Sequence, residues 1–105
     1  MKGYGKLVRD RIPEIIKGQG KVPVVRVLPE EEYRLCLQQK LREEVDEYIA
    51  SGEVEELADV LEVIMALLDA EKRTYEELEE VRARKRRERG GFDRKLFLVG
   101  IEEPE

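Results

Sequence analysis

The spacing of apolar residues along the chain predicts three long helices. Residues 29–50 carry apolar side chains three and four positions apart, and Pro29 suits the first position of a helix. The Ser51-Gly52 step interrupts this pattern, and a second helical pattern covers about residues 53–72. A third helix is expected at about residues 75–89. The chain is therefore expected to be mainly α-helical.

Shorter elements are predicted towards the two ends of the chain. Pro13 suits the start of a short helix through residues 14–17, which Gly18 would end. The β-branched run at 22–28 and the apolar run at 95–100 each predict a short strand, and the two could pair. These runs allow at most a small two-stranded β-ribbon beside the helices.

Capping residues support the third helix and its ends. Thr74 and Glu77 form a capping-box pattern, and Gly90-Gly91 ends the helical pattern. The sequence shows no internal repeat, low-complexity linker or change in composition that would mark a second domain. Residues 1–105 are therefore expected to form one domain, an antiparallel helical bundle.

Apolar side chains cover more than half of the circumference of the second long helix, when each residue advances by 100°. A helix of this kind is expected at the centre of a bundle or against a second subunit. We therefore expect a homo-oligomer that buries its second apolar face. The apolar positions are Leu37, Leu41, Val45, Tyr48 and Ile49 in the first long helix, and Val54, Leu57, Val60, Leu61, Val63, Ile64, Leu67 and Leu68 in the second.

Four acidic residues fall within these apolar arcs or at their edges. Glu44 and Glu47 do so in the first long helix, and Glu56 and Asp59 in the second. In an antiparallel hairpin that turns at Ser51-Gly52, Glu47 would face Glu56 and Glu44 would face Asp59. The two levels would be about 4.5 Å apart, the rise of three helical residues. We call these four residues the predicted carboxylate cluster.

Four carboxylates in one place repel one another and lose hydration, and a hard divalent cation relieves both costs. Oxygen donors favour Mg²⁺, Mn²⁺ or Ca²⁺. For each acid taken alone, the alternative is a solvated helix face. Lys40, for example, can pair with Glu43 or Glu44 at helical spacing.

Composition narrows the classes of function. The 105 residues carry a net charge of -5, which gives no global reason to expect nucleic acid. With no histidine and Cys36 as the one cysteine, the chain cannot form an internal disulfide and lacks the usual zinc ligands. It has no apolar run long enough to span a membrane and no signal-peptide pattern, so no membrane association and a cytoplasmic location are expected.

Two acidic blocks resemble the signature of the MazG-like all-α nucleoside triphosphate pyrophosphohydrolases, a superfamily that includes dimeric dUTPases and phosphoribosyl-ATP pyrophosphohydrolase. The blocks are KLREEVDE at 40–47 and EELADVLEVI at 55–64, which match E-E-x-x-E, a spacer and E-x-x-D. The segments KLVRDRIPEII at 6–16 and KRRERGGFDRKLFL at 85–98 also look like one small MazG-like subgroup. The spacer at 48–55 is shorter than in many members, which favours a tight hairpin.

This resemblance implies Mg²⁺-dependent cleavage of a nucleoside triphosphate between its α and β phosphates, with Mn²⁺ as a substitute metal. The products would be a nucleoside monophosphate and pyrophosphate, in a house-cleaning role against non-canonical nucleotides. It also implies a homodimer or homotetramer. By residue matching, the metal ligands would be Glu44, Glu47, Glu56 and Asp59, and the catalytic residues Glu43, Glu44 and Glu47, with Glu43 as a base or behind the ligands.

Basic residues supply candidate phosphate ligands. Lys85 and Arg89 lie one helical turn apart on the same face of the basic run at 82–89, and Arg9, Arg11 and Lys40 are further candidates for binding substrate. The alternative for each is a surface ion pair. Nucleic-acid binding by 82–89 is a third interpretation, which the scarcity of aromatic residues disfavours.

Two other functions stay open on the sequence. The substrate could be phosphoribosyl-ATP, as the resemblance allows. The chain could instead be a non-catalytic helical interaction module whose acids only solvate its surface.

Overall fold

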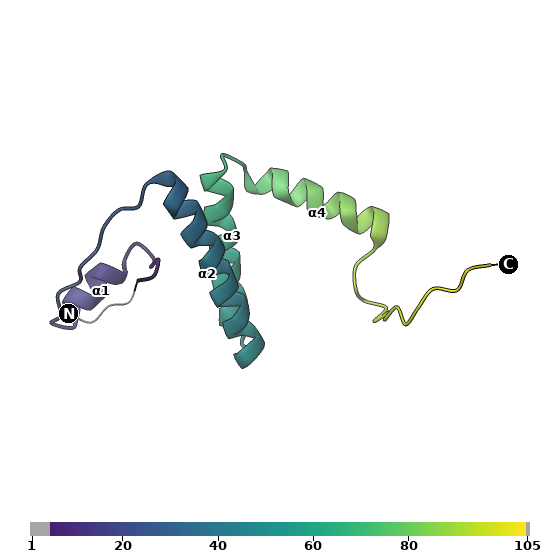
Figure 1. Ribbon diagram of the computed structural model, residues 1–105, viewed down its shortest axis with the longest axis horizontal. Coiled ribbons are helices and arrows are strands. Elements are labelled where there is room, and N and C mark those ends of the chain that lie inside the picture. Colours follow the sequence, from purple (N-terminus) through teal and green to yellow (C-terminus); the bar gives the residue numbers. More distant parts are fainter. Residues whose placement is uncertain (1–4, 105) are drawn as a thin grey trace. The chain divides into compact units, whose positions relative to one another are not determined.

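The computed structural model describes residues 5–104, and this part of the chain is mainly α-helical, as predicted. The chain divides into two compact units, Met1–Arg73 and Thr74–Glu105, each of which is described by itself. No helix in the described part is long and apolar enough to cross a membrane. The helices are α1 (Ile12–Gly18), α2 (Glu30–Ser51), α3 (Val54–Ala70) and α4 (Tyr75–Arg89) (Figure 1).

The first unit is built around an antiparallel hairpin of α2 and α3, which lie side by side (Figure 1). Gly52 ends α2 in the left-handed conformation, at φ 70°, and its N–H donates to the Tyr48 carbonyl at 2.7 Å. Glu53 is extended, and α3 begins at the next residue. The predicted break at Ser51-Gly52 is confirmed, because glycine adopts this conformation without the steric cost of a Cβ.

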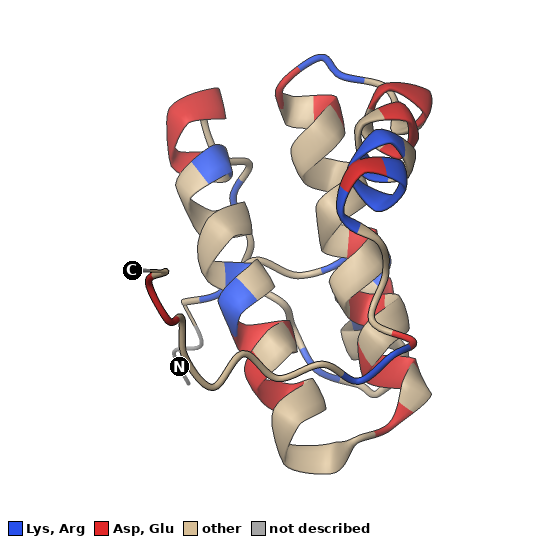
Figure 2. Cartoon of the chain, turned by 90° about the vertical axis from the view of Figure 1, so that its right-hand side faces the viewer, with Lys and Arg blue, Asp and Glu red and all other residues tan. Residues whose placement is uncertain are grey.

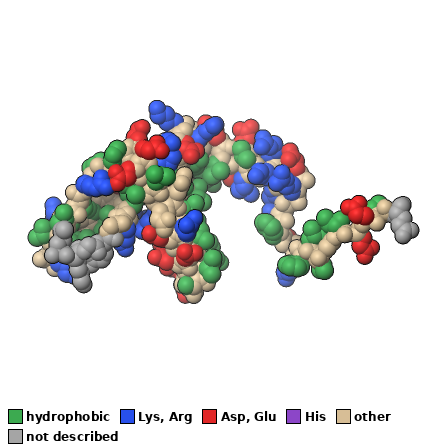
Figure 3. All heavy atoms as spheres, viewed as in Figure 1, with side chains coloured by type: hydrophobic (Ala, Val, Ile, Leu, Met, Phe, Trp, Pro, Cys, Tyr) green, Lys and Arg blue, Asp and Glu red, His purple; other side chains and the backbone are tan. Residues whose placement is uncertain are grey.

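The hairpin has a small apolar core. Leu37 of α2 and Val63 of α3 are the buried hydrophobic side chains among the described residues, with exposed fractions of 3% and 8%. Other apolar residues of α3 stay open: Val54, Leu57, Leu61 and Met65 follow one another at helical spacing and are exposed by 38% or more. Figure 3 shows hydrophobic side chains at the surface of the hairpin. We call these four residues the α3 stripe.

The short helix α1 precedes the hairpin in the same unit. It begins at Ile12, one residue before Pro13, and ends at Gly18, as the sequence predicts to within one or two residues. Residues 5–11 lead into it and place Arg9 beside α3, through an ion pair with Asp59. This contact ties the N-terminal segment to the hairpin.

The second unit contains α4. The Thr74 hydroxyl oxygen accepts the N–H of Glu77 at 3.1 Å, so the predicted N-cap is formed. Gly90, at φ 84°, ends the helix. Arg82 pairs with Glu79 on the same helix at 2.5 Å.

The short two-stranded β-ribbon that the sequence allowed is not formed in the described residues. Residues 5–104 contain no strand, and the runs at 22–28 and 95–100 are irregular. Val22 and Val27 are almost fully exposed, at 88% and 97%. A strand needs a paired neighbour to take up its N–H and carbonyl groups, and the β-branched residues alone do not supply one.

Candidate metal centre

Three carboxylates of the hairpin come within ligand distance of one another. Glu44 of α2 and Glu56 and Asp59 of α3 each offer an oxygen, and these oxygens all lie within 4.8 Å of one another. Glu56 and Asp59 share a face of α3 because they are three residues apart. Figure 2 shows the acidic bands of α2 and α3 beside each other near the connecting turn. We call these three residues the carboxylate triplet.

Glu44 is the buried member of the triplet, with an exposed fraction of 7%. Its Oε1 lies 3.4 Å from the Lys40 ammonium, whereas its Oε2 is buried without a hydrogen-bond donor. Burial raises the pKa of the Glu44 carboxyl, the neighbouring Glu47 carboxyl raises it further, and Lys40 opposes both effects. A buried acceptor without a partner costs stability, so this oxygen lacks a positive partner that a cation would provide.

The donors of the triplet fit a hard divalent cation. They are all carboxylate oxygens, the ligand type that Mg²⁺ and Mn²⁺ take in proteins. Mg²⁺ is usually bound through one or two carboxylates together with water and substrate phosphate oxygens, so the triplet beside the groove has enough oxygen donors to hold it. The unpartnered Glu44 Oε2 is the observation that separates this group from an ordinary acidic surface.

Glu47 lies outside the triplet. The structure brings three of the four residues of the predicted carboxylate cluster together, and Glu47 stays exposed on α2. Glu56 groups with Glu44 and Asp59, instead of facing Glu47 alone. Glu47 still lines the same groove as Glu44, and its role as a metal ligand stays a prediction.

A groove of about 300 Å³ opens beside the triplet. Arg9 lines this groove, and its Nη2 lies 2.5 Å from Asp59 Oδ1. The Arg9 and Asp59 side chains are 57% and 38% exposed, so water reaches this ion pair. Acidic and basic side chains thus face each other across one small space. The groove is lined by Lys6, Val8, Arg9 and Ile12 from the N-terminal part, and by Lys40, Glu44, Glu47 and Asp59 from the hairpin.

Three further residues were predicted for the site: Glu43, Lys85 and Arg89. Glu43 is half-exposed and lies 3.6 Å from the Lys40 ammonium, and it is not among the described residues that line the groove. Lys85 and Arg89 are exposed on α4, in the second unit. Their assignment to substrate binding stays a prediction.

Lys6, Val8 and Ile12 also line the groove, although no sequence pattern marked them as site residues. Arg11, in the same segment, pairs with Glu14 at 3.2 Å and is 85% exposed, outside the groove. No local signal could have found these lining residues, because residues 5–9 are irregular and their path depends on contacts with distant parts of the chain.

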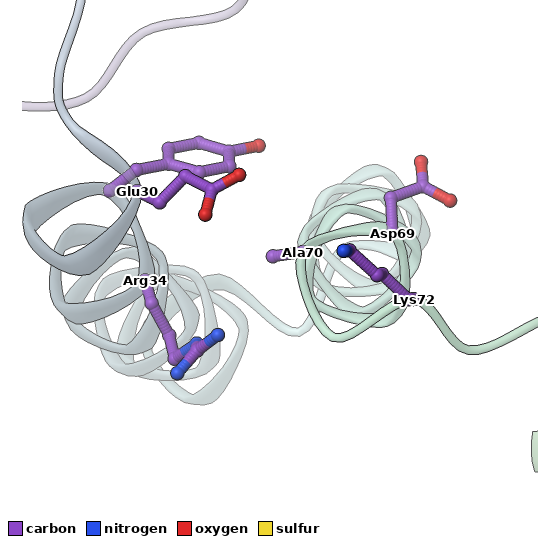
Figure 4. Close-up of a pocket in the computed structure, with 6 residues that line it drawn as sticks. Glu30, Arg34, Asp69, Ala70 and Lys72 are labelled. Atoms are coloured by element: carbon purple, nitrogen blue, oxygen red, sulfur yellow. The ribbon is translucent and has the colours of Figure 1, made fainter.

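A second pocket of about 240 Å³ lies at the far end of the hairpin (Figure 4). Arg34 contributes a buried Nε that has no hydrogen-bond partner. The polar ends of Glu30, Arg34 and Asp69 point in different directions in Figure 4. A binding site needs polar groups that converge on the ligand, so this pocket is the weaker candidate. Its lining residues are Glu30, Tyr33, Arg34, Asp69, Ala70 and Lys72.

Comparison with known proteins finds one partial relative. No protein-family model and no solved structure matches the chain. A segment of 46 residues, 44% of this chain, is 52% identical to a protein of Mycolicibacterium smegmatis (strain ATCC 700084 / mc(2)155), which is described as uncharacterized. The match covers 47% of that relative, so the chain spans about half the length of the protein it is similar to. This similarity assigns no activity, and the chemistry of the groove is the basis for a function.

Proposed function

We propose that this chain is a MazG-like nucleoside triphosphate pyrophosphohydrolase that uses Mg²⁺. The observation that carries the proposal is the buried Glu44, whose unpartnered Oε2 lies beside two further carboxylates. The acidic blocks at 40–47 and 55–64 support the reaction class, because these three residues match ligand positions of the MazG-like pattern.

The carboxylate triplet would hold the metal. When bound, Mg²⁺ would neutralise phosphate charge and acidify a water molecule. Glu44, Glu56 and Asp59 would supply the negative charge that holds it, and the burial of Glu44 would limit competition from bulk water.

Glu47 is the best placed residue to accept a proton. It lines the groove next to Glu44 and remains exposed, whereas Glu43 faces Lys40 and lies outside the lining. In the proposed reaction a water oxygen bonds to phosphorus and its proton goes to Glu47. The bond between that phosphorus and the bridging oxygen breaks, and pyrophosphate and a nucleoside monophosphate are released.

The cations of the groove suit an anionic substrate. Lys40 lies beside Glu43 and Glu44, and Arg9 contacts Asp59, so both cations are close to the triplet. Phosphate oxygens that the metal leaves free need such donors, and Arg and Lys are the residues that supply them in proteins.

We also propose that the protein is a homo-oligomer. The α3 stripe leaves four apolar side chains open, while the hairpin buries only two apolar side chains among the described residues. A stripe along one helix can meet the same stripe of a second copy and form a four-helix arrangement of two hairpins. A second copy therefore supplies the apolar cover that this unit lacks.

The test of the proposed function is pyrophosphate release. We would incubate wild type, Glu56→Gln and the neighbouring control Glu55→Gln with Mg²⁺ and a panel of standard and modified nucleoside triphosphates plus phosphoribosyl-ATP. We expect metal-dependent release, reduced by about 100-fold or more in Glu56→Gln, because losing a ligand costs at least as much as losing a residue behind it. Glu55→Gln should keep its activity, since this residue is exposed and outside the triplet.

The panel also separates the alternatives. Release from phosphoribosyl-ATP alone would move the substrate assignment to that compound. No release from any nucleotide, in a protein whose melting temperature ignores Mg²⁺ and Mn²⁺, would refute the enzyme assignment and favour a non-catalytic interaction module.

A further inference from the structure

The N-terminal segment brings positive charge to a groove that also holds three carboxylates, those of Glu44, Glu47 and Asp59. Lys6 and Arg9 line the groove from this segment, together with Lys40 from α2. Val8 and Ile12, which are half-buried, line it as well. The segment therefore contributes two basic and two apolar side chains to the groove.

Arg9 occupies a carboxylate that the proposed metal would need. Its guanidinium contacts Asp59 Oδ1 at 2.5 Å, and Asp59 belongs to the carboxylate triplet. Both partners are more than a third exposed, and exposed ion pairs of this kind contribute little to stability. The contact can therefore be exchanged at small cost when a divalent cation binds the same carboxylate.

We propose that Lys6 and Arg9 form a polyphosphate-binding wall of this groove. In this proposal Arg9 leaves Asp59 for a phosphate oxygen when a divalent cation takes the Asp59 carboxylate. The identity of the anion as a polyphosphate rests on the proposed function. The exchange of partners rests on the contact between Arg9 and the triplet.

The exchange couples metal and anion binding. Arg9 and the cation compete for one carboxylate, so Arg9 opposes metal binding as long as it has no other partner. A polyphosphate offers Arg9 that other partner, because a guanidinium donates two parallel hydrogen bonds to phosphate oxygens. The anion is therefore expected to strengthen metal binding beyond its direct contact with the metal.

Lys6 allows the binding of the anion to be tested separately from the binding of the metal. It lines the same groove, and no ion pair joins it to the triplet in the described part of the chain. Removal of the Lys6 ammonium should therefore weaken the binding of polyphosphate and leave the affinity for the metal unchanged. Arg11 is the matched control, because it lies in the same segment, outside the groove, and pairs with Glu14.

The experiment is a binding titration of the full chain, read by melting temperature and by calorimetry, without turnover. Mn²⁺ is titrated alone, and pyrophosphate is then titrated at saturating free Mn²⁺. We expect Arg9→Gln to bind Mn²⁺ at least about threefold more tightly in the absence of the anion. It should bind pyrophosphate about tenfold more weakly, the loss typical of one charge-assisted hydrogen bond.

The other variants complete the pattern. Lys6→Gln should weaken pyrophosphate binding and leave Mn²⁺ affinity unchanged, and Arg11→Gln should change neither. Arg9→Lys, which keeps the charge without the paired donors, should bind pyrophosphate with intermediate affinity. It also serves as the second variant if Arg9→Gln does not fold.

The results separate this proposal from the proposed function. If the Arg9→Gln variant binds Mn²⁺ no more tightly and pyrophosphate no more weakly than Arg11→Gln does, the proposed polyphosphate-binding wall is refuted, even if the wild type hydrolyses nucleotides. The expected pattern in a wild-type protein that hydrolyses no nucleotide supports the wall and refutes the enzyme assignment.

Discussion

Glu44 shows at the scale of one residue how an acid can be held where water hardly reaches it. Lys40 balances one of its oxygens, and the other has no donor. The carboxyl pKa is raised, chiefly by burial and then by Glu47. Because the folded state holds this proton more tightly than the unfolded state does, protonation of Glu44 stabilises the folded protein. This contribution to the free energy of unfolding is fully present below the unfolded-state pKa of about 4.3, and it is lost as the pH rises through the folded-state pKa.

Glu44→Gln is therefore expected to raise the stability of the metal-free protein at neutral pH, by roughly 1 kcal/mol, the order of cost of a buried unpaired acceptor. The gain should shrink towards pH 4, where the Glu44 carboxyl is protonated and resembles the amide. Thermal melts in chelator across pH 4–8 measure it. Added Mn²⁺ should stabilise wild type and not the variant.

Glu43→Gln is the control for this prediction, since it removes a half-exposed carboxylate from the same Lys40. Its stability should stay within about 0.5 kcal/mol of wild type at every pH. A Glu44→Gln protein that melts below wild type at neutral pH without metal would contradict the prediction, because the buried carboxylate would then be stabilising.

At the scale of the element, the turn between α2 and α3 sets which acids meet. Gly52 reverses the chain in two residues, so the acids on either side of the turn lie at similar heights on neighbouring helices. Its φ of 70° lies in the left-handed region, where a side chain meets its own backbone. There is open space around the position, so the conformation alone determines the cost of a substitution.

Gly52→Ala is expected to destabilise the hairpin by about 1–2 kcal/mol, the cost of the left-handed conformation for a residue with a Cβ. Gly18→Ala is the matched control. Gly18 is also in open space but ends α1 without a left-handed φ, so alanine should be neutral or stabilising there. Urea unfolding at one protein concentration compares them. Equal effects of the two substitutions would show that the turn tolerates a Cβ.

At the scale of the whole molecule, the α3 stripe exceeds what the hairpin can cover. Leu37 and Val63 are buried, and four apolar residues of α3 are not. Only two apolar side chains of the described residues are buried, so this unit has a small core of its own. Stability of this unit is therefore expected to depend on protein concentration, as it does when a second subunit covers the apolar face.

Leu61→Glu is expected to weaken the oligomer at least about tenfold, since a buried unpaired charge costs more than the 1.4 kcal/mol that a tenfold change represents. Sedimentation velocity over a range of concentrations measures it, with Glu62→Gln as a control on the same helix that should assemble like wild type. A wild type that sediments as a single chain at all concentrations would contradict the prediction. Another part of the same chain would then have to cover the α3 stripe.

The sequence by itself determined the helices and the turn of this protein. Helical spacing, Gly52 and the Thr74 cap are local signals, and each depends on the chemistry of a few neighbouring residues. It also placed Glu44, Glu56 and Asp59 near one another, because two antiparallel helices of known rise leave little freedom.

Only the tertiary structure decided the rest. It left Glu47 outside the triplet, and it brought Arg9 across 50 residues of sequence to Asp59 and Lys6 to the same groove, through a segment whose path no periodicity describes. It also left 22–28 without strand pairing, since a strand exists only with a partner. Local patterns fix the conformation of each segment, whereas contacts between distant segments depend on how well their surfaces fit.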